Sequence, residues 1–185
     1  DLHFAPDGVV EALEQAKQEG KVRFVGFTGH KDPAIHQRML EYNFSFDTCQ
    51  LPLNCFDASF RSFEQVILPE LLKRQIAPIG MKSLGGDGKS VSSGTITAEE
   101  ALRYAMSLSV AVTVSGIDSK EVLEQNLAIA RGFTPLSEGD KILLRERCKP
   151  IAADGRFELY KTTAQHEGDV GREQHGFPLQ EKVAA

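Results

Sequence analysis

The chain has 185 residues, of which 41% are hydrophobic and 25% are charged, and its formal net charge is −5. This composition predicts a globular chain with a buried core rather than a disordered one. The acidic balance argues against nucleic acid or an anionic membrane as a partner, and no apolar run approaches the roughly 20 residues that span a bilayer.

The three cysteines, Cys49, Cys55 and Cys148, follow no metal-ligand spacing. We therefore expect reduced, partly buried thiols in a cytoplasmic protein, and no metal site. The chain begins at Asp1 without a signal-peptide pattern, which suggests an excerpt or a processed product of a longer protein.

Short β-branched runs alternate with amphipathic helical stretches along the chain. The predicted helices cover residues 8–18, 33–42, 60–74, 97–108, 119–131 and 135–152. The predicted strands cover residues 22–27, 48–51, 76–81 and 110–114. Gly20 is the expected stop of the first helix, and Pro33 suits the first turn of the second. Leu68, Leu71 and Leu72 are expected to face inward from the third.

Three local signals add detail to this pattern. Thr97 followed by Glu100 is typical of a capping box at a helix start. The strand over 110–114 is almost entirely apolar, which predicts burial on both faces in a parallel sheet. The glycine-rich stretch over 84–94 predicts a mobile loop, in which Gly85, Gly86 and Gly88 either cradle a phosphate or are merely flexible.

Four strand–helix repeats predict parallel β/α units, which fit either an open doubly wound sheet or part of a barrel. No GxGxxG motif follows a strand, so the dinucleotide fingerprint of the open fold is missing. A complete TIM barrel needs about 250 residues and eight strands. The sequence therefore predicts an α/β fold that is part of a TIM (β/α)8 barrel.

Four segments of the chain together resemble the aldo/keto reductase family. They are GKVRFVGFTGH at 20–30, QLPLN at 50–54, GMKSLGG at 80–86, and SGIDS at 115–119 with QNL at 125–127. Each is similar to the end of one of the family's strands five to eight, in order. The resemblance implies the C-terminal half of the barrel over residues 1–152, with four parallel β/α units, a C-terminal helix, and a surface tail over 153–185. Together with GRFELY at 155–160, it points to a bacterial branch of oxidoreductases.

The resemblance implies reduction of an aldehyde or ketone by hydride transfer from NADP in its reduced form, with NAD possible. Thr28 and Gln50 match the positions that hold the nicotinamide carboxamide. The other implied cofactor-binding residues are Met81, Lys82, Ser83, Leu84, Gly116, Ile117, Asp118, Ser119, Gln125 and Asn126. Their chemistry agrees, because a carboxamide pairs with Gln50 and a pyrophosphate with Lys82 or with amides at a helix start.

The sequence departs from the family pattern in two ways. Gly29 stands where the family often has Asn, and Gly116 and Val122 stand where NADP-preferring members carry Lys and Arg. The family's catalytic Asp, Tyr, Lys and His belong to the first four strands and have no counterpart here, so no catalytic residue is assigned, His3 included. We expect a chain that is inactive alone and completed by the missing N-terminal half of the barrel.

Other interpretations remain open at this point. The chain is alternatively a catalytically incomplete nucleotide-binding or assembly module, or part of a TIM-type lyase or isomerase. Tyr104 and Tyr160 are possible proton donors, although Tyr104 fits packing on a helix face better. His30 and His36 are expected at the surface.

Overall fold

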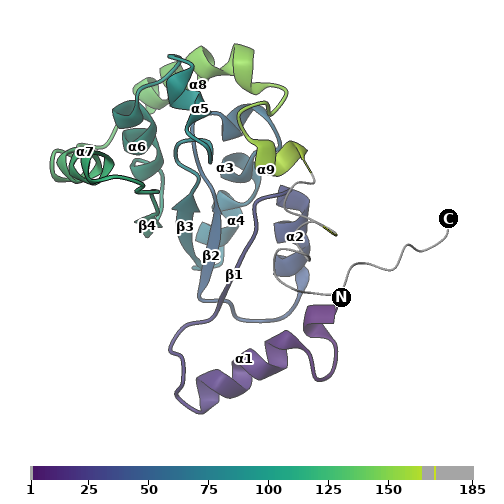
Figure 1. Cartoon of the computed structure of the whole chain (residues 1–185). Helices are drawn as coiled ribbons and strands as arrows, with labels where there is room; N and C mark the ends of the chain where they lie inside the picture. Colours follow the sequence, from purple (N-terminus) through teal and green to yellow (C-terminus); the bar gives the residue numbers. More distant parts are fainter. Residues whose placement is uncertain (1, 164–168, 170–185) are drawn as a thin grey trace.

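The computed structural model describes residues 2–163 and residue 169, and in this part strands alternate with helices (Figure 1). The strands are β1 (Gly26–Thr28), β2 (Thr48–Pro52), β3 (Ala77–Met81) and β4 (Val112–Thr113). The longer helices are α1 (Val9–Gln18), α2 (Pro33–Glu41), α6 (Ala98–Met106), α7 (Lys120–Arg131) and α8 (Glu138–Ala152). The shorter ones are η1 (Leu2–Phe4), η2 (Asp57–Ser59), α3 (Phe63–Val66), α4 (Leu68–Lys73), α5 (Lys89–Ser92) and α9 (Leu159–Thr162).

Side-chain caps explain where α2 and α6 begin. The Asp32 carboxylate accepts from the Ala34 amide at 2.9 Å, with Pro33 in the first turn of α2. The predicted capping box of α6 is confirmed, because Thr97 and Glu100 each accept a bond from the other's backbone amide. These local bonds satisfy amides that a helix start otherwise leaves without partners.

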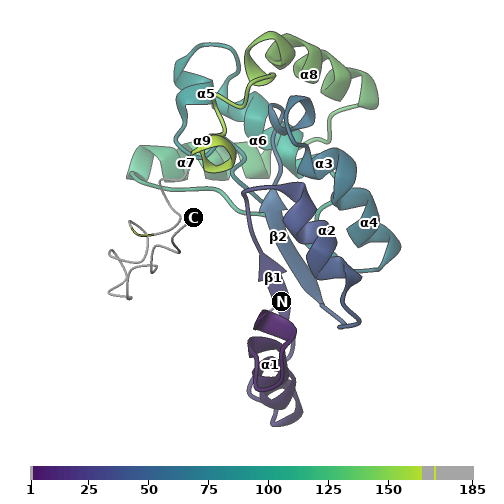
Figure 2. The ribbon, with the colours of Figure 1, turned by 90° about the vertical axis from the view of Figure 1, so that its right-hand side faces the viewer.

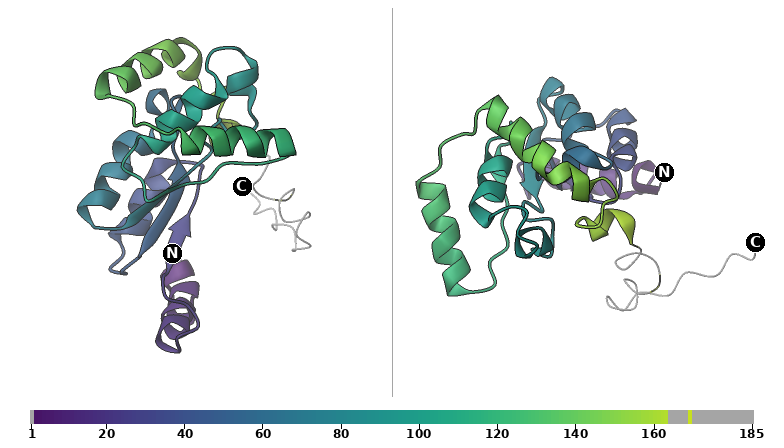
Figure 3. Two further views of the ribbon diagram at one scale, coloured as in Figure 1. Left: turned by 90° about the vertical axis from the view of Figure 1, so that its left-hand side faces the viewer. Right: turned by 90° about the horizontal axis from the view of Figure 1, so that it is seen from above.

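The four strands form one parallel sheet in the order β1-β2-β3-β4 (Figure 1). Helices α2, α3 and α4 lie on one side of the strands (Figure 2). Helices α7 and α2 lie at opposite edges of the molecule, and α1 extends away below β1 (Figures 1 and 3). Parallel strands joined by helices are the predicted architecture, and the prediction is confirmed.

The two faces of the sheet differ in burial. Cys49, Leu51 and Pro78 are buried on the face that the helices cover. Gln50 and Ile79, which are register partners, are only half-buried on the other face. The covered face leads into the core, whose largest fully buried side chains include Tyr104, Phe56, Phe63, Leu51, Leu53, Ile67 and Leu71.

The two edge strands are shorter than predicted. β1 lacks residues 22–25 of the predicted strand, and Phe24 is 65% exposed. β4 has two residues instead of the predicted five, and Val112 and Val114 are 52% and 44% exposed, so burial on both faces was wrong. The physical reason is that each edge strand pairs with a neighbour on one side only in the described part of the chain.

The prediction of one continuous helix over residues 60–74 was wrong. The structure has α3 and α4 there, separated at Ile67, and the first begins only after Ser62, whose hydroxyl caps it. Leu68 and Leu71 are buried as predicted, but Leu72 is 45% exposed. Pro69 in the first turn of α4 explains the break, because its nitrogen cannot donate into the preceding turn.

Two further predictions about surfaces were wrong. His36 is 1% exposed, between the rings of Phe27 and Phe63 at 5.2 and 5.0 Å between centroids. Residues 154–163 are no loose surface tail, because Tyr160 and Lys161 on α9 are 7% and 1% exposed. The rest of the predicted tail, apart from residue 169, lies outside the described residues, and the division at 152 stays a prediction.

Candidate active site

The carboxyl ends of the strands bring the predicted carboxamide ligands together. Thr28 ends β1 and is the register partner of Gln50 in β2, so both point to the half-exposed face of the sheet. Gln50 in turn pairs with Ile79, two residues before Met81 ends β3. Ligand sites of parallel β/α proteins lie at this end of the strands.

A cavity of about 730 Å³ opens beside Gln50, between the loop after β3 and the loop after β4. We call it the rim cavity. It is lined by Gln50, Met81, Lys82, Ser83, Leu84, Gly86, Asp87, Gly88, Val114, Gly116, Ile117, Asp118 and Val122. Eight of the twelve predicted cofactor-binding residues are in this lining. The exceptions are Thr28, Ser119, Gln125 and Asn126.

Lys82 lies in an unusual backbone conformation at the rim cavity. Its φ is +59°, in the left-handed region that side chains other than glycine rarely adopt. Its carbonyl accepts from the Asn54 side-chain amide at 3.2 Å and from the Gly85 amide at 2.8 Å. Such conformations persist where surrounding contacts hold them, and they concentrate at functional sites.

The glycine-rich stretch, which the sequence predicts to be a mobile loop, contains a turn and a short helix. A turn over 83–87 leads into α5, and the Ser90 hydroxyl donates to the Leu84 carbonyl at 2.7 Å. A Cβ at Gly85 would lie 3.0 Å from the Phe157 carbonyl oxygen, and φ there is +76°. Only glycine combines that backbone conformation with that approach.

The loop after β4 is held by α7. The Ser119 hydroxyl accepts from the Val122 amide at 3.2 Å and caps the helix. The Asn126 side-chain amide donates to the Ser115 hydroxyl at 3.2 Å and to the Gly116 carbonyl at 3.4 Å. Ser119 and Asn126 therefore support the loop from behind the rim cavity, while Gln125 is exposed on α7.

Charge around the rim cavity is mixed. Its lining contains one cation, Lys82, and two carboxylates, Asp87 and Asp118. Asp87 pairs with Lys89 at 2.9 Å. Lys120, the cation next to the loop, is exposed and pairs with Glu124 at 3.5 Å. The arrangement leaves Lys82 as the cation available to an anionic ligand within the lining.

Behind Lys82 lies a group of interacting side chains that the sequence did not predict. We call it the buried polar cluster, and its members are Asn54, Asp57, Glu158, Tyr160 and Lys161. The Lys161 ammonium, fully buried, contacts the Asp57 carboxylate at 2.6 Å and the Glu158 carboxylate at 2.9 Å. Burial raises the pKa of both carboxyls, and the neighbouring Lys161 opposes that rise.

The hydroxyl groups of Tyr160 and Tyr104, the two possible proton donors, both donate hydrogen bonds to buried carboxylates. The Tyr160 hydroxyl donates to Glu158 at 2.5 Å and accepts from Asn54 at 3.2 Å, and burial raises its pKa well above the usual range. The Tyr104 hydroxyl donates to the buried Glu64 carboxylate at 2.6 Å, and neither residue lines the rim cavity. Tyr104 is a packing residue, as expected, with its side chain 0% exposed.

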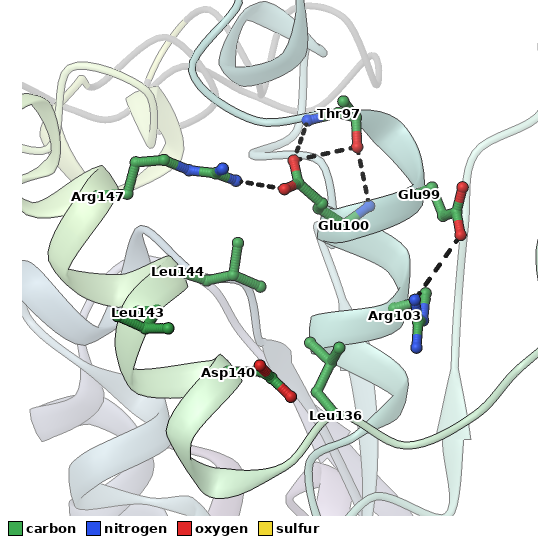
Figure 4. A pocket seen from close by; sticks show the side chains of 9 residues that line it. All are labelled: Thr97, Glu99, Glu100, Arg103, Leu136, Asp140, Leu143, Leu144 and Arg147. Atoms are coloured by element: carbon green, nitrogen blue, oxygen red, sulfur yellow. Dashed lines mark hydrogen bonds and ion pairs between the residues drawn. The ribbon is translucent and has the colours of Figure 1, made fainter.

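A second cavity, of about 620 Å³, lies between α6 and α8 (Figure 4). Four of its charged side chains form ion pairs, one pair across the cleft and one along α6. The Arg147 guanidinium contacts Glu100 at 2.7 Å, and Arg103 contacts Glu99 at 3.8 Å. No strand residue lines this cleft, whereas residues of β2 and β3 line the rim cavity, so the rim cavity is the better candidate site.

The described residues contain neither a candidate metal site nor a candidate membrane-spanning helix. No group of three His, Cys, Asp or Glu side chains is placed there to hold a metal ion. None of the helices in residues 2–163 has the length and apolar character needed to cross a membrane.

Parallel strands with flanking helices and a cavity at their carboxyl ends define part of a (β/α)8 barrel. Comparison with solved structures identifies the type of barrel. The apo form of aldo-keto reductase AKR11C1 from Bacillus halodurans superposes with a TM-score of 0.60 at 18% identity, over 80% of this chain and 59% of that one. Its holo form gives 0.59 at 18% identity, over 76% and 55%.

An aldo/keto reductase from Brucella melitensis gives a TM-score of 0.51 at 17% identity, over 74% of this chain and 53% of that chain. The chain thus has the aldo-keto reductase type of fold, as the resemblance predicted, and it spans a little over half the length of these structures. No protein-family model and no curated protein sequence matches the chain.

Proposed function

We propose that this chain supplies the cofactor-binding half of an NAD(P)H-dependent oxidoreductase that reduces an aldehyde or ketone. The observation that carries the proposal is the rim cavity, which gathers Gln50, Lys82 and Gly116 from three separate strand ends. The fold of the chain, which is that of aldo-keto reductases, supports the same placement.

The residues at the rim cavity fit a nicotinamide nucleotide chemically. Gln50 is half-buried and offers one donor and one acceptor group, which a carboxamide requires. Lys82 provides a positive charge for a pyrophosphate. A Cβ at Gly116 would meet nothing within 4 Å, so the loop after β4 leaves space for a ligand. The buried Asn126 side-chain oxygen, on α7 next to this loop, has no hydrogen-bond partner among the described residues and is a further acceptor.

The proposal keeps Thr28, Ser119 and Gln125 as cofactor ligands in the bound state, with Thr28 beside Gln50 on the same face. Gly29 lacks the side chain that the family often uses here, and the structure offers a reason. A Cβ at Gly29 would lie 2.7 Å from the His36 ring. We propose NADP or NAD as the cofactor. Lys82 is the only cation among the described residues that line the rim cavity, and a single cation does not select between the two.

We further propose that catalysis needs residues outside this chain. None of the described tyrosines has a hydroxyl free to donate a proton at the rim cavity. The hydroxyls of Tyr104 and Tyr160 bond to carboxylates. Tyr42 precedes β2 in the chain, and its ring stacks on that of Phe4 with 3.7 Å between the ring centroids. The remaining strands and the catalytic groups would come from an N-terminal half that pairs with β1 and β4. Three free, buried cysteines support a cytoplasmic setting.

Fluorescence titration of the chain with NADPH tests the proposal. We expect saturable binding by the wild type and binding weaker by about tenfold in Gln50→Ala, since a good hydrogen bond contributes about 1 kcal/mol or somewhat more. Gln37→Ala is the matched control, because Gln37 is exposed on α2 outside the rim cavity. No binding by the wild type, or equal losses in both variants, would refute the assignment.

A carbonyl panel added to the same titration separates the two candidate functions. We expect no turnover by this chain alone. Turnover by the chain alone would contradict the proposal that catalysis needs residues outside it. If NADPH binds but no turnover occurs even after the remaining barrel half is added, a non-catalytic nucleotide-binding module is favoured.

A further inference from the structure

The wall of the rim cavity is anchored from behind, through the strained backbone at Lys82. A left-handed conformation at a lysine is unfavourable unless surrounding contacts hold it. The contact that reaches it from another part of the fold is the Asn54 side-chain amide, which donates to the Lys82 carbonyl at 3.2 Å. Asn54 is 0% exposed, and its side-chain oxygen accepts from the Phe56 and Asp57 amides at 2.9 and 3.0 Å.

Asn54 is itself held by α9 and the residue before it. Its amide nitrogen also lies 3.3 Å from the Glu158 carboxylate and 3.2 Å from the Tyr160 hydroxyl, so its two protons are shared among these two acceptors and the Lys82 carbonyl. Glu158 is fixed in turn by Lys161, whose ammonium also donates to the Phe60 carbonyl at 2.7 Å. Lys161 and Glu158 are each 1% exposed, so this part of the chain is built into the fold.

The same segment also contacts the cavity wall directly. The Lys82 ammonium lies 5.8 Å from the centre of the Tyr160 ring, within the range of a cation–π contact. A Cβ at Gly86 would lie 3.4 Å from the same ring, and one at Gly85 would lie 3.0 Å from the Phe157 carbonyl. Residues 157–161, which we call the C-terminal strap, therefore brace the turn after β3 at successive points.

We propose that the C-terminal strap is a fixed support of the rim cavity, in which Tyr160 and Glu158 are positioning residues for Lys82 and the glycine turn. Neither touches the cavity itself, so they act through Asn54, Lys82 and Gly86. A cation held over a ring and a backbone held in a strained conformation are both pre-organised before a ligand binds, which lowers the cost of binding.

Hydrogen exchange read by mass spectrometry tests the strap without any cofactor. In Tyr160→Leu, which removes both the ring and the hydroxyl, we expect amides of 82–88 to exchange about tenfold faster, as local opening becomes easier. Tyr104→Leu is the matched control, because Tyr104 is also a buried tyrosine that donates to a glutamate. Unchanged exchange at 82–88 in Tyr160→Leu, or an equal change in Tyr104→Leu, would overturn the proposal.

The phenylalanine variants keep the test decisive if the leucine variants fail to fold. Tyr160→Phe retains the ring against Lys82 and Gly86 but loses the bonds to Glu158 and Asn54. We expect exchange at 82–88 to rise about threefold in Tyr160→Phe, because one support is lost and one is kept, and to stay at the wild-type rate in Tyr104→Phe. Wild-type exchange in both variants would overturn the role of the hydroxyl.

A second readout rests on the proposed function. NADPH affinity should fall about tenfold in Tyr160→Leu and stay unchanged in Tyr104→Leu, since only the first disturbs Lys82. If the wild type does not bind NADPH, the proposed function fails, and the exchange result alone decides on the strap. If NADPH binds equally well to both variants, the strap does not position the site.

Discussion

His36 gives the sharpest prediction about stability. Its ring is 1% exposed, and neither ring nitrogen makes a hydrogen bond of good geometry among the described residues, although the nearby Gln50 backbone opposes part of the fall in the His36 pKa. Burial lowers its pKa from 6.5 to about 4, because the packed rings of Phe27 and Phe63 do not solvate a charge. In the unfolded chain the same ring is hydrated and keeps its ordinary pKa near 6.5.

The sign of the pH dependence follows from this difference. Below pH 6.5 the unfolded chain binds a proton at His36 and the folded chain does not, so stability is lost as the pH falls from 6.5 towards 4. Each pH unit in that window costs about 1.4 kcal/mol, so the loss between pH 6.5 and pH 5.0 is about 2 kcal/mol. Above pH 6.5 the group contributes no pH dependence.

Urea unfolding of the wild type and of His36→Phe at pH 7.5 and pH 5.0 measures the effect. Phenylalanine keeps an aromatic ring beside Phe27 and Phe63 but cannot titrate. The buried carboxyls Glu64 and Glu158 have raised pKa values, so their protonation favours the folded state as the pH falls. This opposite trend is common to both proteins and cancels in the comparison. We expect the wild type to lose about 2 kcal/mol more than the variant; equal losses would refute the reasoning.

Two other predictions concern packing. Gly29→Ala should destabilise the fold by about 1–3 kcal/mol, because its Cβ would lie 2.7 Å from the His36 ring. In a double-mutant cycle measured by urea unfolding, His36→Ala should relieve most of that loss. Additive losses would contradict the clash. All three cysteines are free and 0% exposed; burial raises the pKa of Cys49 to about 12, whereas a hydrogen bond with Cys55 lowers the pKa of Cys148, so the prediction rests on burial. A thiol reagent should therefore find no fast-reacting cysteine in the folded protein and three after denaturation, and rapid reaction of the native protein would contradict the burial.

Local signals predicted the elements that depend on local interactions. The cap at Thr97 and the proline at Pro33 mark the starts of their helices correctly, because a cap involves residues only a few positions apart. The length of β1 and β4 was not predictable in the same way. A strand extends only as far as its partners do, and each edge strand has one partner in the described chain.

The family resemblance, rather than any local pattern, led to eight residues that line the rim cavity, and their role in binding a cofactor stays a proposal. The buried polar cluster was not predictable, since Asp57 and Lys161 are joined by a contact across 104 residues of sequence, and each reads alone as an ordinary exposed charge. The burial of His36 could have been predicted from the spacing of residues along α2. Pro33, His36 and Leu40 recur at helical spacing on α2, and all three are buried on one face.

The central claim is that the rim cavity binds a nicotinamide nucleotide. Nuclear magnetic resonance of the ¹⁵N-labelled chain during NADPH addition tests it most directly, because each amide reports its own surroundings. We predict shifts at the side chain of Gln50 and at the backbone of 82–84 and 116–118. Shifts centred on Arg103 and Arg147 in the cleft between α6 and α8, or no shifts at a saturating concentration, would contradict the claim.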